Sequence, residues 1–130
     1  MKNMLRTLGL LAVAPLLLAG DQPAADILLL WRSDCAPCWQ EATMLPDLAR
    51  KFPTVHFTVL SLHGDVTHDH WPDNIDIDHD DTDAPFVRYG NMSKHLPFSV
   101  ALHRDGSVCA GQDGLISETA IKMWTLQCAK

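Results

Sequence analysis

A pair of cysteines, Cys35 and Cys38, stands at the junction between a continuous apolar run and a stretch with helical periodicity. The run, Ile27–Trp31, is typical of a strand buried on both faces, as in a parallel sheet. After Cys35, apolar residues recur every three or four positions, as on the buried face of a helix: Cys38, Ala42, Leu45, Leu48, Ala49 and Phe52. The chain is therefore predicted to pass from a buried strand into a helix across the two cysteines.

The rest of the pattern predicts one α/β domain with a mixed central sheet flanked by helices. The further predicted segments are strands at 55–62, 98–103 and 107–111 and helices at 82–89 and 117–128. Pro46 lies inside the first helical pattern and predicts a kink there. The stretch Gly64–Asp83, with eight Asp and three His, is interpreted as a solvated acidic loop. The expected order of elements is β-α-β-α-β-β-α.

The N-terminus has the three-part layout of a secretory signal. Lys2 and Arg6 precede the apolar run Thr7–Leu18, and the small residues Ala19 and Gly20 follow it. The run is shorter than the roughly 20 residues of a membrane span. We expect residues 1–20 to be a signal peptide or an uncleaved N-terminal anchor, residues 21–130 to form a single domain, and the protein to be exported, in the periplasm.

Charge and cysteine content narrow the function classes. The formal net charge is −6 without any basic run, which argues against a nucleic-acid partner. Four cysteines in an exported small domain fit two disulfides, with three possible pairings. No feature of the sequence indicates the oligomeric state.

The segment Cys35-Ala36-Pro37-Cys38 suits thiol–disulfide chemistry because a helix N-terminus stabilises a thiolate, the reactive species. Cys35 would attack or be attacked, and Cys38, one turn further, would resolve the mixed disulfide. Three other interpretations compete. A c-type haem site needs His after the second Cys, where Trp39 stands; structural zinc needs a second close ligand pair. An inert structural disulfide remains the third.

A wider set of residues resembles the thioredoxin family, nearest its exported TlpA-like group, which includes cytochrome-maturation reductases. Trp31 and the Cys35–Cys38 segment are followed by Leu96-Pro97 at the opening of a strand. The resemblance, over Ile27–Gly114, implies a thioredoxin-like fold, a cis Leu96–Pro97 bond that binds substrate, and supporting roles for Trp31, Pro37 and Glu41. It implies that the protein needs no cofactor beyond the redox-active disulfide. It also implies protein dithiol or disulfide substrates and a membrane protein that donates electrons.

The departures from that family bear on proton transfer. Thioredoxins carry a buried Asp where this chain has Leu29. Glu41 fits the exported group, but the helix proline falls at Pro46 rather than near Thr43. The proton acceptor for Cys38 is therefore open, with Glu41 and the Asp-rich stretch as candidates.

Two residues beside the cysteines favour a reducing couple over an oxidising one. Pro37 donates no hydrogen bond to a thiolate, and the negative charge of Asp34 is expected to raise the pKa of Cys35. We predict a potential nearer that of thioredoxin, about −270 mV, than that of DsbA, about −120 mV.

The remaining cysteines, Cys109 and Cys128, fall in the last strand and on the sheet-facing side of the last helix. We favour a structural disulfide between them. A second redox pair that relays electrons is the alternative.

The acidic stretch supports a rival function, binding or delivery of copper or zinc through Cys35, Cys38 and this segment. His63, His68, His70 and His79 lie in or beside it, and imidazole and carboxylate bind such metals. Their spacing fits no closed site, so we predict no metal centre and keep these four as weak candidates. The negative charge could instead select basic partner surfaces. An interaction domain without redox activity is a third class, which the presence of both cysteines disfavours.

Overall fold

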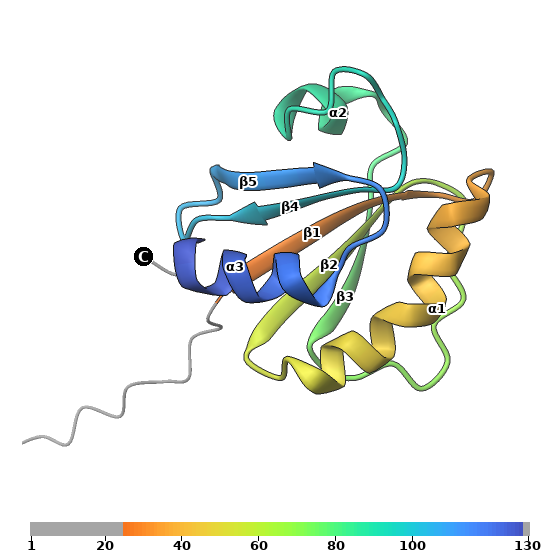
Figure 1. Ribbon diagram of the computed structural model, residues 1–130. Helices are drawn as coiled ribbons and strands as arrows, with labels where there is room; N and C mark the ends of the chain where they lie inside the picture. Colours follow the sequence, from red (N-terminus) through yellow and green to blue (C-terminus); the bar gives the residue numbers. More distant parts are fainter. Residues whose placement is uncertain (1–24, 129–130) are drawn as a thin grey trace, which may run out of the picture.

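The computed structural model describes residues 25–128. The predicted export segment, residues 1–20, lies outside them. Five strands form one sheet, and three helices surround it (Figure 1). The strands are β1 (Ala25–Arg32), β2 (Val55–His63), β3 (Ile75–His79), β4 (Phe98–Leu102) and β5 (Val108–Asp113). The helices are α1 (Ala36–Lys51), α2 (Ala84–Arg88) and α3 (Glu118–Cys128).

Strand β1 occupies the centre of the sheet, whose order is β3-β2-β1-β4-β5. It pairs in parallel with β2 and antiparallel with β4, so the sheet is mixed. Buried on both faces, β1 needs a run of apolar residues, as the sequence has from Ile27 to Trp31. The mixed sheet with flanking helices confirms the predicted fold class.

The predicted loop at Gly64–Asp83 was wrong in one part, because Ile75–His79 is a strand that pairs in parallel with β2. Ile75 is buried and Ile77 half-buried, whereas Asp76 and Asp78 are exposed. This alternation is that of an edge strand with one apolar face. The surrounding Asp residues concealed the short pattern, and they also protect the open edge of the sheet from pairing with another chain.

Two apolar clusters hold the layers together. On one face of the sheet, α1 and α3 pack over Ile27, Leu29 and Trp31. On the other face, Phe86 of α2 packs with residues of β1, β2 and β4: Leu28, Leu30, Leu60, Leu62, Phe98 and Val100. Alternate residues of β1 thus serve opposite clusters, which fixes this strand within the core.

Helix α1 continues from Ala36 to Lys51 through Pro46 and shares its face of the sheet with α3. Its buried residues include Cys38, Glu41 and Leu45. The helix ends before Phe52, whose backbone N–H donates to the carbonyl of Leu48.

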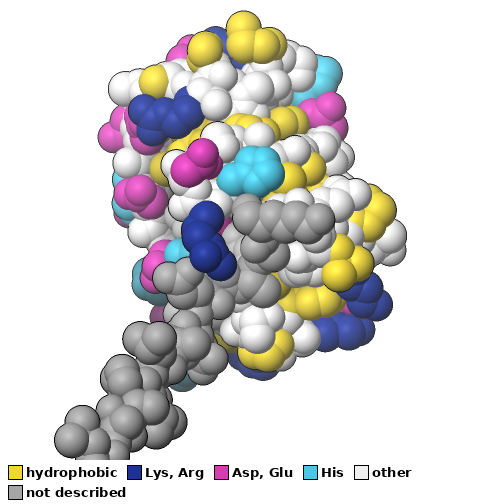
Figure 2. Space-filling view, turned by 90° about the vertical axis from the view of Figure 1, so that its left-hand side faces the viewer, with side chains coloured by type: hydrophobic (Ala, Val, Ile, Leu, Met, Phe, Trp, Pro, Cys, Tyr) yellow, Lys and Arg dark blue, Asp and Glu magenta, His cyan; other side chains and the backbone are white. Residues whose placement is uncertain are grey.

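The molecular face opposite α1 carries charges of both signs. Figure 2 shows Lys and Arg side chains there interspersed with Asp and Glu, with hydrophobic side chains between them. Among the described residues, no helix has both the length and the apolar character needed to cross a membrane.

The second pair of cysteines forms a disulfide in the structure. Cys109 of β5 and Cys128 of α3 are bonded, with their Cα atoms 5.8 Å apart. Cys128 is buried, and Cys109 is half-buried against the core. The bond ties the last helix to the edge of the sheet.

We predict that this disulfide stabilises the fold. It closes a loop with a sequence separation of 19, which in the loop-entropy account is worth about 3 kcal/mol. The double variant Cys109→Ala/Cys128→Ala should therefore unfold at a lower urea concentration under non-reducing conditions. Reduction of a small disulfide substrate should be unchanged. An unaltered unfolding midpoint would argue against the structural role.

Candidate active site

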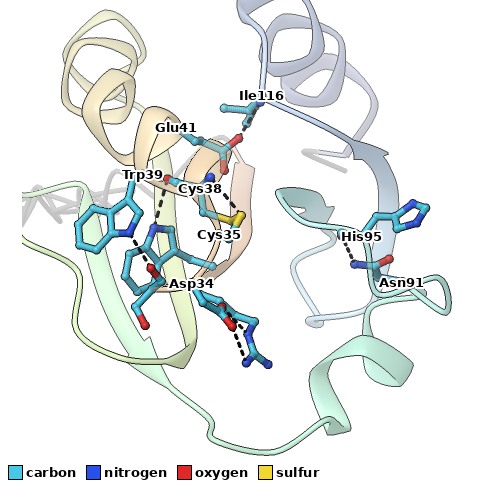
Figure 3. The surroundings of a disulfide bond; sticks show 11 residues. Asp34, Cys35, Cys38, Trp39, Glu41, Asn91, His95 and Ile116 are labelled. Atoms are coloured by element: carbon cyan, nitrogen blue, oxygen red, sulfur yellow. Dashed lines mark hydrogen bonds and ion pairs between the residues drawn. A yellow bond between two sulfur atoms is a disulfide. The ribbon is translucent and has the colours of Figure 1, made fainter.

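The Cys35–Cys38 disulfide lies where β1 passes into α1 (Figure 3). Arg32 ends the strand, a short turn follows, and Cys35 is the N-cap residue of the helix. The backbone N–H of Cys38 lies 3.2 Å from Cys35 Sγ, so the first turn of the helix offers this sulfur a donor. Pro37 fits the first turn because the missing N–H would have no helical partner there.

The two sulfurs differ in their access to solvent. Cys35 is half-buried, whereas Cys38 is completely buried. An external thiol or disulfide can therefore reach Cys35 but not Cys38. The arrangement fits the predicted division between an attacking and a resolving cysteine.

Two tryptophans hold the turn around the disulfide. The buried Trp31 donates its indole N–H to the carbonyl of Cys38, with an N–O distance of 3.2 Å. Trp39 donates to the carbonyl of Ser33 at 2.8 Å, and its ring meets that of Trp31 edge to face, with centroids 4.8 Å apart. Trp31, which the sequence predicts to support the site, contacts the disulfide turn through this hydrogen bond.

Glu41 is the only buried carboxylate among residues 25–128, with 2% of its surface exposed. It lies one helical turn after Cys38, on the same face of α1 (Figure 3). The backbone N–H of Ile116 donates to Oε2 at 2.8 Å. Burial raises the pKa of Glu41 to about 7, and the Ile116 hydrogen bond opposes this only in part. A carboxyl group that exchanges its proton near neutral pH therefore lies beside the inner cysteine.

Asp34 does not act on Cys35 as an isolated charge, which corrects the sequence-based argument. Its carboxylate receives two hydrogen bonds from Arg32, at 3.0 and 3.2 Å. The hydrogen bonds from this guanidinium hold the pKa of Asp34 below its ordinary value. Since the pair is neutral overall, its influence on the Cys35 thiolate is smaller than that of a lone carboxylate. Of the two arguments for a reducing couple, only Pro37 remains.

The loop before β4 carries the predicted substrate-binding position. The Leu96–Pro97 peptide bond is cis, and the carbonyl of Pro97 accepts the N–H of Gly114 at 2.9 Å. Buried Asn91 donates to the carbonyl of His95 at 2.8 Å and so braces the loop. Figure 3 shows His95 and Trp39 on opposite sides of Cys35.

The four histidines considered as metal ligands do not converge. His63 is exposed beside the active-site turn, where its carbonyl accepts the N–H of Ser33. His68 and His70 lie near Trp71, and His79 ends β3. Within residues 25–128, no group of three His, Cys, Asp or Glu side chains could hold a metal ion.

Sequence reasoning missed several residues of the site. Ile116 contributes a backbone N–H to Glu41 across 75 positions of the chain. Arg32 neutralises Asp34, and Asn91 supports the loop before Pro97. The Arg32–Asp34 pair has a spacing of two residues that could have suggested it, whereas the other two contacts depend on the tertiary fold.

Comparison with known proteins places the chain by its fold. No protein-family model and no curated protein sequence matches it. A thioredoxin-related protein from Neisseria meningitidis serogroup B shares 22% identity, with a TM-score of 0.60 over 84% of this chain and 87% of that chain. A Chlorobium tepidum structure described as a thiol:disulfide interchange protein DsbE gives 18% identity and a TM-score of 0.60, over 85% and 83%.

A third similar structure is a secreted disulfide oxidoreductase of Mycobacterium tuberculosis. It is 20% identical, with a TM-score of 0.57 over 81% of this chain and 82% of that chain. At these identities the comparisons establish the fold, which is thioredoxin-like. Within that fold, the disulfide of this chain lies at the start of the first helix, next to a buried carboxylate.

We predict that Glu41 makes stability depend on pH. Between the ordinary value of 4.5 and about 7, the folded protein keeps a proton that the unfolded chain has lost. The free energy of unfolding should therefore fall as pH rises through this window, by about 3 kcal/mol from this residue, and level off above it.

Glu41→Gln removes the ionisation, so the variant should gain stability relative to the wild type between pH 5 and pH 8. Urea unfolding of the oxidised proteins measures the difference. Asp47→Asn, which alters an exposed carboxylate on the same helix, serves as control. Equal pH dependence in wild type and Glu41→Gln would show that Glu41 ionises normally.

Proposed function

We propose that this protein is an exported thiol–disulfide oxidoreductase that reduces disulfides of other proteins in the periplasm through Cys35 and Cys38. One observation carries the proposal: a disulfide at a helix N-terminus has an accessible sulfur, a buried sulfur and a buried carboxyl group of near-neutral pKa beside it. Thioredoxin-like oxidoreductases among the similar structures support the same activity.

The reaction begins with the reduced protein. The Cys35 thiolate attacks one sulfur of the substrate disulfide, forms a mixed disulfide and releases the other substrate sulfur as a thiolate. Cys38 then attacks Cys35 Sγ, which forms the intramolecular disulfide and frees the second substrate sulfur. Two electrons pass from the protein dithiol to the substrate, and each released thiolate takes up a proton.

The second step requires that buried Cys38 lose a proton. Leu29 is apolar and buried in the same cluster as Cys38, so it offers no acceptor. Glu41, one turn away with a pKa of about 7, can accept the proton at neutral pH and return it when the disulfide is reduced again. We assign Glu41 this role.

The reducing direction rests on the residue before the inner cysteine. Pro37 has no N–H or side-chain donor with which to stabilise a thiolate, so the reduced state gains little there. An exported reductase needs a source of electrons, and a membrane protein that passes them to Cys35–Cys38 would supply it.

We predict different results for the two cysteines. Cys38→Ser should still attack a substrate disulfide but be unable to resolve it, so a mixed disulfide through Cys35 should accumulate. Cys35→Ser should form no such adduct and show no turnover. Insulin reduction and mass spectrometry of the alkylated, unreduced products measure both. Adduct formation through Cys38 in Cys35→Ser would overturn the assignment of the attacking sulfur.

We also predict that the Cys35–Cys38 couple has a reduction potential below about −220 mV. Equilibration of the wild-type protein against glutathione or dithiothreitol measures it. A value above about −150 mV would instead indicate an oxidase or isomerase and would reverse the proposed electron flow while leaving the two-cysteine chemistry in place.

A further inference from the structure

A groove of about 320 Å³ runs along α1, and its lining includes Trp39, the residue that follows Cys38. Trp39 and Pro46 belong to its helical wall, and Thr67 and Trp71 to the wall formed by the segment after β2. We call it the α1 groove. No residue of the loop that carries Pro97 lines this groove. Figure 3 shows Trp39, which lines the groove, and His95, which belongs to that loop, on opposite sides of Cys35.

The walls of the α1 groove are held in place without a ligand. Asn74 donates to the carbonyls of Ala49, Phe52 and Val55 at 2.9 to 3.2 Å, which joins the end of the segment to the end of α1. Arg50 donates to the carbonyl of His70 at 3.3 Å. Binding there would cost little ordering of the protein.

Each wall of the groove carries one aromatic ring. Trp39 is 37% exposed although its indole N–H and ring edge are fixed by Ser33 and Trp31. Trp71 forms the opposite wall and packs partly on the core. Rigid, partly exposed aromatic rings of this kind are the residues that contribute most to binding at protein interfaces.

The wall formed by the segment after β2 is acidic. Asp69 lies in this wall, and an adjoining hollow that shares His70 and Trp71 is lined by Asp73 and Asp76. Between Lys51 and Arg88 the chain has no Lys or Arg. Among the residues that line the groove, Arg50 is the one Lys or Arg, and it is already engaged with Asp47 and the His70 carbonyl.

We propose that the α1 groove is a docking site for the polypeptide substrate, and that it takes a segment in which an apolar or aromatic side chain lies next to Lys or Arg. The two tryptophans would receive the apolar side chain, and Asp69 and Asp73 the positive charge. This inference rests on the proposed reductase function and adds a substrate class to it. The substrates would be proteins whose disulfide lies next to a basic segment.

Binding is tested without any redox step. The oxidised protein is titrated with two peptides in which Ser replaces Cys. Each peptide has an aromatic residue other than Trp, followed in one peptide by two Lys and in the other by two Glu. Tryptophan fluorescence or calorimetry reports the Kd. We expect the Lys peptide to bind roughly fivefold or more tightly than the Glu peptide, as two exposed ion pairs allow, with the difference shrinking at high salt.

Two matched variants separate local from overall charge. Asp69→Asn/Asp73→Asn should abolish the preference for the Lys peptide. Asp78→Asn/Asp81→Asn removes the same charge from exposed positions outside the groove. This variant should retain the preference for the Lys peptide. If both variants lost the preference for the Lys peptide equally, net charge alone would explain it and the docking site would be overturned. Equal binding of the two peptides by the wild type would also overturn it.

A substitution of Trp71, in the wall opposite α1, tests the groove independently of charge. Trp71→Ala should weaken Lys-peptide binding and raise KM for a disulfide form of that peptide, while reduction of 2-hydroxyethyl disulfide stays unchanged. Absence of all disulfide reduction would refute the proposed function, yet the peptide titration would still decide the groove. Self-association of the wild type that Trp71→Ala abolishes would assign the groove to a second copy and overturn the proposal.

Discussion

The pairing of β1 with strands on both sides fixes the position of the active site. Because β1 is hydrogen-bonded to β2 and β4 and buried on both faces, its carboxyl end cannot move independently of the core. The turn that follows places Cys35 at the N-cap of α1, where the helix supplies both an N–H donor and a favourable electrostatic field. The difference in exposure between Cys35 and Cys38 is a direct result, since the second cysteine lies on the inner face of the helix.

The parts of the site encoded in short stretches of sequence could be predicted, whereas those formed across the fold could not. The strand, the helix and the cysteines between them produce a local pattern of apolar spacing, so both the fold class and the position of the two cysteines at the strand–helix junction followed from it. Strand β3 was missed because its only signal is Ile75 and Ile77 between exposed aspartates. The hydrogen bond from Ile116 to Glu41 joins residues far apart in the chain and depends on where α3 packs.

The effects of charged residues could not be predicted from the sequence either, because they depend on contacts made in the fold. The sequence shows that Asp34 precedes Cys35, but its effect depends on whether a cation reaches it, and in the structure Arg32 does. The acidic stretch likewise suggests metal ligands as long as its shape is unknown. Once β3 and the segment before it are placed, its side chains point along an edge strand and a groove wall rather than toward one point. In the proposed docking site, two of these residues, Asp69 and Asp73, would contact a basic polypeptide segment.

Glu41 connects the stability of the fold to its chemistry. A carboxylate with 2% exposure and a single hydrogen bond is unfavourable when charged, and the fold bears this cost at neutral pH. A glutamine could accept the same N–H from Ile116 without the cost. Features that weaken a fold in this way are expected where function requires them. Here the destabilising group lies one helical turn from Cys38, the residue that must give up a proton in the proposed reaction, so burial sets its pKa where a proton acceptor needs it.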